Sequence, residues 1–162
     1  DTNVPVLLVA YEALYNIGND EAAADLLVEH GVVKQTFQTI QNFDYEKALV
    51  ASVMKFLTVL TYNESAVVEV GNMTFLPIIF QAMKTRSGNA DFALDAVHVI
   101  SNLVPEESNR ACVNNNRLLP EILKLLDTFA DHEDIAKFVA ITCLRLSTDD
   151  EISKQVAQEG MR

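Results

Sequence analysis

Histidine and cysteine are the side chains through which this chain would hold a metal or perform nucleophilic catalysis. The histidines, His30, His98 and His132, are far apart, and none has a second His or a Cys three or four residues away. A zinc site on a helix needs such closely spaced ligands. Cys112 has only the neighbouring Arg110 to lower its pKa, which is a weak arrangement. The pattern therefore favours neither a metal centre nor an enzyme, and no cofactor is expected.

A dense polar turn, Asp131-His132-Glu133-Asp134, is the other place where ligand chemistry is conceivable. It lacks the alternating oxygen ligands and the Gly of a calcium loop. It is therefore predicted to be the solvated start of a helix. The chain also has no Gly-rich phosphate loop and no nucleophile elbow.

Asn102 is the polar side chain that most needs an explanation. It lies in the apolar run FALDAVHVISNLV, residues 92–104, three residues before Pro105. Its amide offers both a hydrogen-bond donor and an acceptor. One interpretation is that Asn102 ends its helix or bonds a neighbouring carbonyl. The other is that it faces a partner, and the sequence favours neither interpretation over the other.

Composition limits the class of protein. The chain has 162 residues, the size of one domain, and its few Gly and Pro favour helices. No apolar run reaches the roughly 18 residues of a membrane helix, so no direct membrane insertion is expected. The formal charge of −11 would repel nucleic acid and anionic membranes. Two cysteines in apolar helical patterns, Cys112 and Cys143, predict buried free thiols and a cytoplasmic location.

An internal period of 43 residues runs through the whole chain without a gap. At positions 43 residues apart, apolar residues match apolar residues of similar size, and carboxylates match carboxylates. We call each set of matching positions a column. The clearest columns are Ile17, Leu60, Leu103 and Leu146; Leu27, Val70, Val113 and Val156; and Glu21, Glu64, Glu107 and Asp150.

Each full unit of the repeat is predicted to hold three helices. The first is short, the second is amphipathic, and the third is apolar on most sides, as expected for a helix between neighbours. The expected helices are 21–30, 32–42 and 45–61; 64–71, 75–85 and 90–104; and 109–115, 118–129 and 134–147.

Local signals agree with these helices. Pro77 and Pro120 lie in the first turn of second helices, where a missing N–H costs nothing. Asn63, Ser108 and Asp149 are placed to cap first helices.

A unit of this length with a short, a medium and a long helix resembles the armadillo repeat. The helix endings ALYNI (13–17) and VISNL (99–103) are similar to that family's A-L-x-N-L/I motif, and the joins at 29–33 and 114–126 are similar to its G-x-[IL]-[PL]-x-[LI]-x-x-L-L motif. The resemblance implies an all-α, right-handed α-solenoid in which third helices line a concave groove. Such a groove binds extended peptides or partner proteins.

The resemblance implies that Asn16 and Asn102 point into the groove and bond the main chain of a peptide. Two copies of the repeat depart from this pattern, with Val59 and Arg145 at the Asn position. The chain also has no Trp, whereas nuclear-transport receptors of this family carry a regular series of Trp and Asn residues along the groove. A nuclear import adaptor is therefore not expected. The predicted groove residues are Glu12, Asn16, Lys55, Val59, Asp95, His98, Asn102, Lys137, Phe138 and Arg145.

The predicted organisation is a single armadillo-like domain over residues 1–162. It comprises the end of a repeat (1–19), full repeats at 20–62, 63–105 and 106–148, and the start of another (149–162). Neither end has a polar cap, so we expect a fragment of a longer solenoid or self-association through its ends.

The expected function is a non-catalytic scaffold or adaptor whose partner is a protein or extended peptide. Association with the cytoskeleton, a cilium or a membrane would arise through partners. The alternative is a helical repeat that binds nucleic acid, which the charge disfavours.

Overall fold

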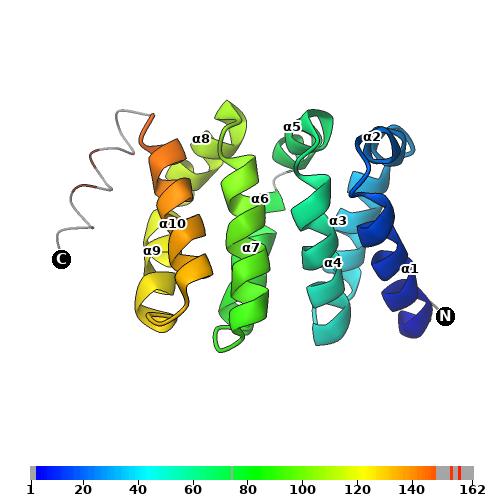
Figure 1. The fold of residues 1–162 in the computed structure, drawn as a ribbon, viewed down its shortest axis with the longest axis horizontal. Helices are drawn as coiled ribbons and strands as arrows, with labels where there is room; N and C mark the ends of the chain where they lie inside the picture. The colour runs from blue at the N-terminus through cyan, green and yellow to red at the C-terminus, as the bar shows by residue number, and fades with distance from the viewer. Residues whose placement is uncertain (1–2, 74, 149–153, 155–156, 158–162) are drawn as a thin grey trace. The chain divides into compact units, whose positions relative to one another are not determined.

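The computed structural model describes residues 3–73, 75–148, 154 and 157. This part of the chain forms ten helices and no strand (Figure 1), which confirms the all-α class. The chain divides into two compact units, residues 1–75 and residues 76–162, called unit 1 and unit 2 below.

In unit 1 the long helices α1 and α4 pack along each other (Figure 1), while α3 contacts α2, α4 and α5. Its core is built from fully buried side chains of α3 and α4, including Val33, Leu49, Phe56 and Leu60. The helices are α1 (Val4–Ile17), α2 (Glu21–Glu29), α3 (Val32–Asn42), α4 (Lys47–Leu60) and α5 (Glu64–Asn72).

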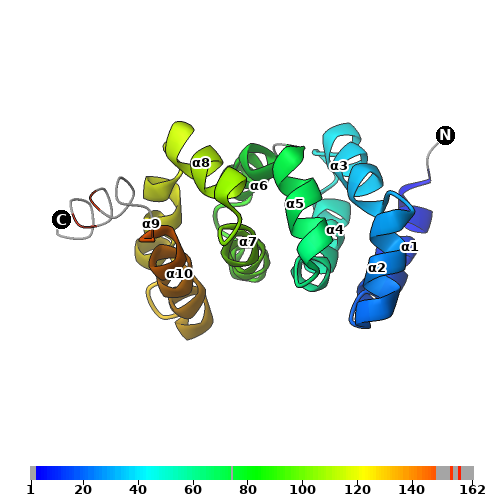
Figure 2. The ribbon, with the colours of Figure 1, turned by 90° about the horizontal axis from the view of Figure 1, so that it is seen from above.

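In unit 2 the long helix α10 packs against both α7 and α9, and Figure 2 shows α9 beside α10. Ile100, Leu103, Ile122 and Leu146 are among its fully buried side chains. The helices are α6 (Phe75–Thr85), α7 (Ala90–Leu103), α8 (Glu107–Asn115), α9 (Leu119–Thr128) and α10 (Glu133–Leu146), with Phe75 itself belonging to unit 1.

All nine helices predicted from the 43-residue period are present, and their ends differ from the prediction by two residues or fewer. Pro77 and Pro120 lie in the first turns of α6 and α9, as predicted. The turn at 131–134 is the start of α10, with Glu133 and Asp134 in its first turn, which is also confirmed.

Side-chain caps fix the starts of several helices. The Asp20 carboxylate accepts from the Ala23 N–H at 2.9 Å, and the Asn63 amide oxygen accepts from the Ala66 N–H at 3.0 Å. Asn63 was predicted as a cap and is confirmed. Ser108 is not a cap, because α8 begins one residue earlier, at Glu107, with Glu106 in the capping position. Asp149 lies outside the described residues.

The joins between first and second helices use a left-handed backbone in both units. Gly31 has a φ of 77° before α3, and Arg117 has a φ of 51° before α9. These two positions belong to the same column of the 43-residue period. A left-handed residue turns the chain sharply enough for the short helix to lead into the amphipathic one, and Gly adopts this conformation at least cost.

Candidate binding face and cavities

The predicted groove residues of unit 2 gather on α7 and α10. The His98 and Phe138 rings stack with their centroids 4.2 Å apart and their planes 24° apart. Both side chains are half-buried, so the stack is partly accessible to solvent. The pair forms because α7 and α10 pack along each other and each contributes one ring to the same face. We call His98, Lys137, Phe138 and Arg145 the α7/α10 face.

Two cations border the stacked rings. The Lys137 Nζ lies 5.9 Å from the Phe138 ring centroid, and the Arg145 Nη1 donates a hydrogen bond to the Ser101 carbonyl on α7. Arg145 is therefore held in place, while its side chain remains half-buried. Burial lowers the pKa of His98, and the positive charges of Arg145 and Lys137 lower it further. The face consequently presents a neutral imidazole near pH 7, together with the positive charges of Arg145 and Lys137.

Asp95 and Asn102 lie on α7 with His98, at spacings of three and four residues that place all three on one side of the helix. Both are half-buried, and both already take part in interactions within the protein. Asn102 is the next-to-last residue of α7. Its position is thus compatible with either interpretation, helix termination or contact with a partner.

The predicted groove residues of unit 1 form a different arrangement on α1 and α4. Lys55 on α4 places its Nζ 4.8 Å from the centroid of the Tyr15 ring on α1. Glu12 and Asn16, one turn apart on α1, are both exposed. Val59 is only 9 % exposed, so its contribution to an accessible face is small.

Unit 1 also contains a polar cavity that the sequence did not predict. Its volume is about 590 Å³, and it lies where the α1–α2 turn approaches the end of α4 and the start of α5. Val59 lines it together with the carboxylates Glu21, Asp25 and Glu64. Asn63 donates to Asp25 at 2.6 Å, which ties the cap of α5 to α2.

A second cavity, in unit 2, was likewise not predicted. It is lined by α6, α7 and α9, which are mostly second helices of the repeat, so it is separate from the residues chosen for the groove. The only signal available was the amphipathic pattern of α6 and α9, and that pattern equally describes ordinary core packing.

The cysteines are free and half-buried, less buried than the sequence suggested. Burial raises the pKa of both thiols. Arg110 does not activate Cys112, because its Nη1 donates to the carbonyls of Val104 and Pro105. Among the described residues, no group of three His, Cys, Asp or Glu side chains could hold a metal ion.

Within the described part of the chain, no single helix is both long and apolar enough to cross a membrane. Only α5 and α6 taken together, as a bent pair, meet the length and composition requirement.

Comparisons with protein-family models, with curated proteins and with solved structures found no match to this chain.

Proposed function

We propose that this chain is a non-catalytic protein-interaction module, a scaffold or adaptor, built as a right-handed solenoid of armadillo-like repeats. The 43-residue period supports this, because it predicted the helices in both units. The pairwise packing of third helices, α1 with α4 and α7 with α10, supports it too. In such a solenoid the third helices would line one continuous groove.

The α7/α10 face is the observation that carries the proposal. Aromatic and arginine side chains dominate the energetics of protein interfaces, because they offer large, rigid contact areas together with polar groups. Here a stacked ring pair, His98 and Phe138, is accompanied by Lys137 and Arg145 on two packed helices. An extended peptide would lay an apolar or aromatic side chain on the rings and place acceptors near the two cations. Asn102 would bond its main chain.

The nucleic-acid alternative has weaker support. A protein that follows a phosphate backbone needs several cations along one track. The chain has 12 Lys and Arg against 23 Asp and Glu. In unit 1 the predicted face includes the cation of Lys55 but also the exposed carboxylate of Glu12.

The test is to select peptides from a displayed library on the immobilised chain and to measure their affinity for variants. The double variant Lys137→Ala/Phe138→Ala removes one exposed cation and one ring from the α7/α10 face. We expect it to weaken binding at least about tenfold, the effect of losing one interface hot spot. The matched control is Lys34→Ala/Tyr45→Ala, which also removes an exposed lysine and an exposed ring, but from α3 and the turn after it. Binding should then change less than about twofold.

Two outcomes contradict the proposal. Equal losses in the two double variants would mean that the α7/α10 face does not carry the binding. Tight binding of single-stranded RNA or duplex DNA, with an affinity that falls steeply with salt and is lost with Lys137, would favour the nucleic-acid alternative.

A further inference from the structure

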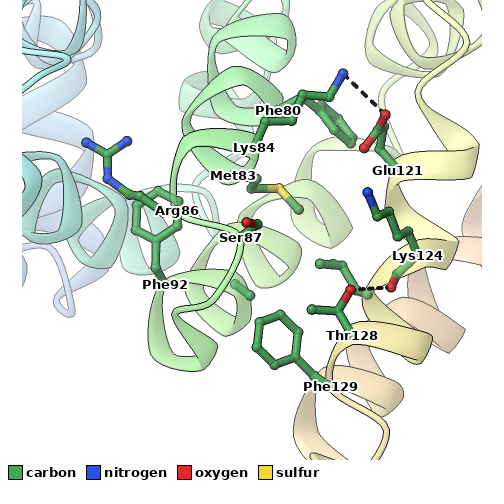
Figure 3. A pocket seen from close by; sticks show the side chains of 12 residues that line it. Phe80, Met83, Lys84, Arg86, Ser87, Phe92, Glu121, Lys124, Thr128 and Phe129 are labelled. Carbon is green, nitrogen blue, oxygen red and sulfur yellow. Dashed lines mark hydrogen bonds and ion pairs between the residues drawn. The ribbon is translucent and has the colours of Figure 1, made fainter.

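The cavity of unit 2 has an apolar floor and a charged rim (Figure 3). Its volume is about 240 Å³, and it lies between α6, α7 and α9. The floor residues are each no more than 8 % exposed: Phe80, Met83, Phe92, Ala93 and Leu125. Phe129, just after α9, also lines the cavity, and Ser87 and Thr128 lie at its opening.

The size of this cavity limits what it can hold. Sites for drug-sized molecules usually measure about 300–1,000 Å³, and this cavity of about 240 Å³ is smaller. It is suited to a single bulky side chain. Apolar walls hold water poorly and favour an apolar occupant. Met83 on the floor has a flexible, polarizable thioether, which can adapt to side chains of different shapes.

The rim is positive in an otherwise acidic chain. Figure 3 shows Lys84, Glu121 and Lys124 together at the α6–α9 side of the cavity. Lys84 and Glu121 form an ion pair with 3.2 Å between Nζ and Oε1. Lys124 is exposed and has no ion-pair partner among the described residues. Two lysines against one carboxylate leave a net positive charge at the opening, where an anionic group would be attracted.

Arg86 supports the opposite wall. Its Nη1 donates to the Ala82 carbonyl at 3.3 Å and to the Thr85 Oγ1 at 2.9 Å. Its guanidinium carbon lies 5.2 Å from the centroid of the Phe92 ring (Figure 3). The hydrogen bonds orient Arg86, and its contact with the ring helps to keep Phe92 in position. Preorganisation of this kind lowers the cost of binding.

We propose that this cavity is a docking site for an acidic peptide segment, which inserts one bulky apolar side chain and places a neighbouring carboxylate near Lys124. The apolar floor recognises the side chain, and the lysine rim recognises the charge. This site is independent of the α7/α10 face, because the two share no residue.

A peptide fits these features better than a fatty acid or a nucleic acid. A long acyl chain needs more apolar volume than the cavity offers. A nucleic acid would need several phosphate contacts and gains little from an apolar floor. A peptide needs only one apolar anchor, and its main chain can remain in solvent.

The experiment is an NMR titration of the chain with the peptide acetyl-Gly-Ser-Phe-Asp-Glu-Gly-Ser-amide, with the methionine methyl groups labelled. We expect the Met83 methyl signal to shift in a saturable way, because Met83 lines the cavity. The signal of the Met54 methyl, which is fully buried and does not line the cavity, should not shift. Two further peptides, with Ala in place of Phe or with Lys-Lys in place of Asp-Glu, should produce no saturable shift.

Two variants separate the roles of the rim and the floor. Lys124→Glu changes an exposed residue and should weaken the binding of the acidic peptide about tenfold at low salt, as expected when an attractive contact becomes repulsive. The matched control is Lys34→Glu, which makes the same charge change at an exposed lysine on α3 and should leave this binding within about twofold. Ala93→Leu fills the cavity and should abolish the Met83 shift, with far-UV circular dichroism used to confirm that the helices are retained.

Several results would overturn the proposal. One is the absence of a Met83 shift at millimolar peptide, and another is an equal shift with the Lys-Lys peptide. Equal weakening by Lys124→Glu and Lys34→Glu would show that the charge acts only through the net charge of the whole molecule. Saturable binding of decanoate without binding of the peptide would assign the cavity to a fatty acid instead.

Discussion

In unit 1 the third helices α1 and α4 pack along each other, as α7 and α10 do in unit 2, yet matching positions carry different side chains. Two repeats before His98 and Phe138, the chain has Glu12 and Ser52. Unit 2 therefore has an aromatic stack where unit 1 has two small or acidic polar residues. The packing that holds the helices together does not depend on these positions. They are consequently free to differ, and it is there that binding specificity can reside.

The buried columns show a second difference, this time between α1 and the later third helices. Leu60, Leu103 and Leu146 are all 0 % exposed, whereas Ile17, in the same column on α1, is 47 % exposed. Val6 on α1 is 61 % exposed, although the matching Leu49 on α4 is completely buried. An apolar residue thus repeats in the sequence whether or not a neighbouring helix covers it, and only covered copies contribute their full hydrophobic free energy.

The largest expected effect is the difference between Leu103→Ala and Ile17→Ala in their free energies of unfolding. Replacing the fully buried Leu103 should lower the free energy of unfolding by about 2–5 kcal/mol, because it removes buried methyl groups and leaves a cavity. Ile17→Ala should cost less than about 1 kcal/mol, because the side chain is already half in water and Ala is a better helix former. Urea denaturation followed by far-UV circular dichroism measures both.

A loss at Ile17 as large as the loss at Leu103 would mean that Ile17 is covered in solution. A dependence of the Ile17→Ala effect on protein concentration would then identify a second copy of the chain as the cover.

The next-largest expected effect concerns Gly31 and Arg117, the left-handed residues that join first and second helices. Gly31→Ala should lower the free energy of unfolding by about 1 kcal/mol, because a Cβ is strained at positive φ. Nothing lies within 4 Å of the added Cβ, so the backbone is the only cause. Arg117→Gly should raise the free energy of unfolding by up to about 1 kcal/mol, because Arg117 has the same kind of backbone without the freedom of Gly.

Thermal melts of these two variants show directly whether each substitution raises or lowers the stability of the protein. Destabilisation by Arg117→Gly would show that the Arg117 side chain contributes more than its backbone strain costs. The helical content of both variants should match the wild type, since neither position lies inside a helix.

Sequence reasoning was most successful where a feature repeats. The helix positions follow from columns such as Leu60, Leu103 and Leu146, because each copy is independent evidence for the same buried face. The cap at Ser108 failed because a single polar residue near a helix start can lie inside or outside the first turn. The capping position of α8 is held by Glu106, which belongs to the column of Asp20 and Asn63 but makes no side-chain cap hydrogen bond.

The candidate sites were harder to predict, because they depend on contacts between residues far apart in the sequence. The period places His98 and Phe138 on third helices but does not show that their rings stack. The cavity beside Lys124 arises where three helices fail to fill the space between them, and no sequence pattern records a gap in packing.

A smaller effect is expected in the pH dependence of the stability of unit 2, and it arises from His98. Because burial, Arg145 and Lys137 lower its pKa in the folded state, the unfolded state binds a proton more readily. The resulting stability is fully present above the unfolded value of about 6.5 and is lost as the pH falls toward the lower folded pKa. We expect Phe138→Ala to raise the pKa of His98, because removal of the ring exposes the imidazole to water.

Lys137→Ala should raise the pKa of His98 by less than Phe138→Ala does, because burial is the larger cause and the lysine charge the smallest. Titration of the His98 ring protons by NMR measures both shifts. If neither variant changes the titration, the stacked arrangement of His98 and Phe138 is not the one that persists in solution.

The smallest expected effect concerns the thiol of Cys112. The Asn116 amide lies 3.5 Å from its Sγ, and this hydrogen bond lowers a pKa that burial has raised. Asn116→Ala should therefore raise the pKa further and slow the reaction with a disulfide reagent at neutral pH about twofold, because only the thiolate reacts. The rate should be measured in a Cys143→Ser background, so that a single thiol is observed. An increase in rate would indicate that Asn116 shields the sulfur from the reagent more than it stabilises the thiolate.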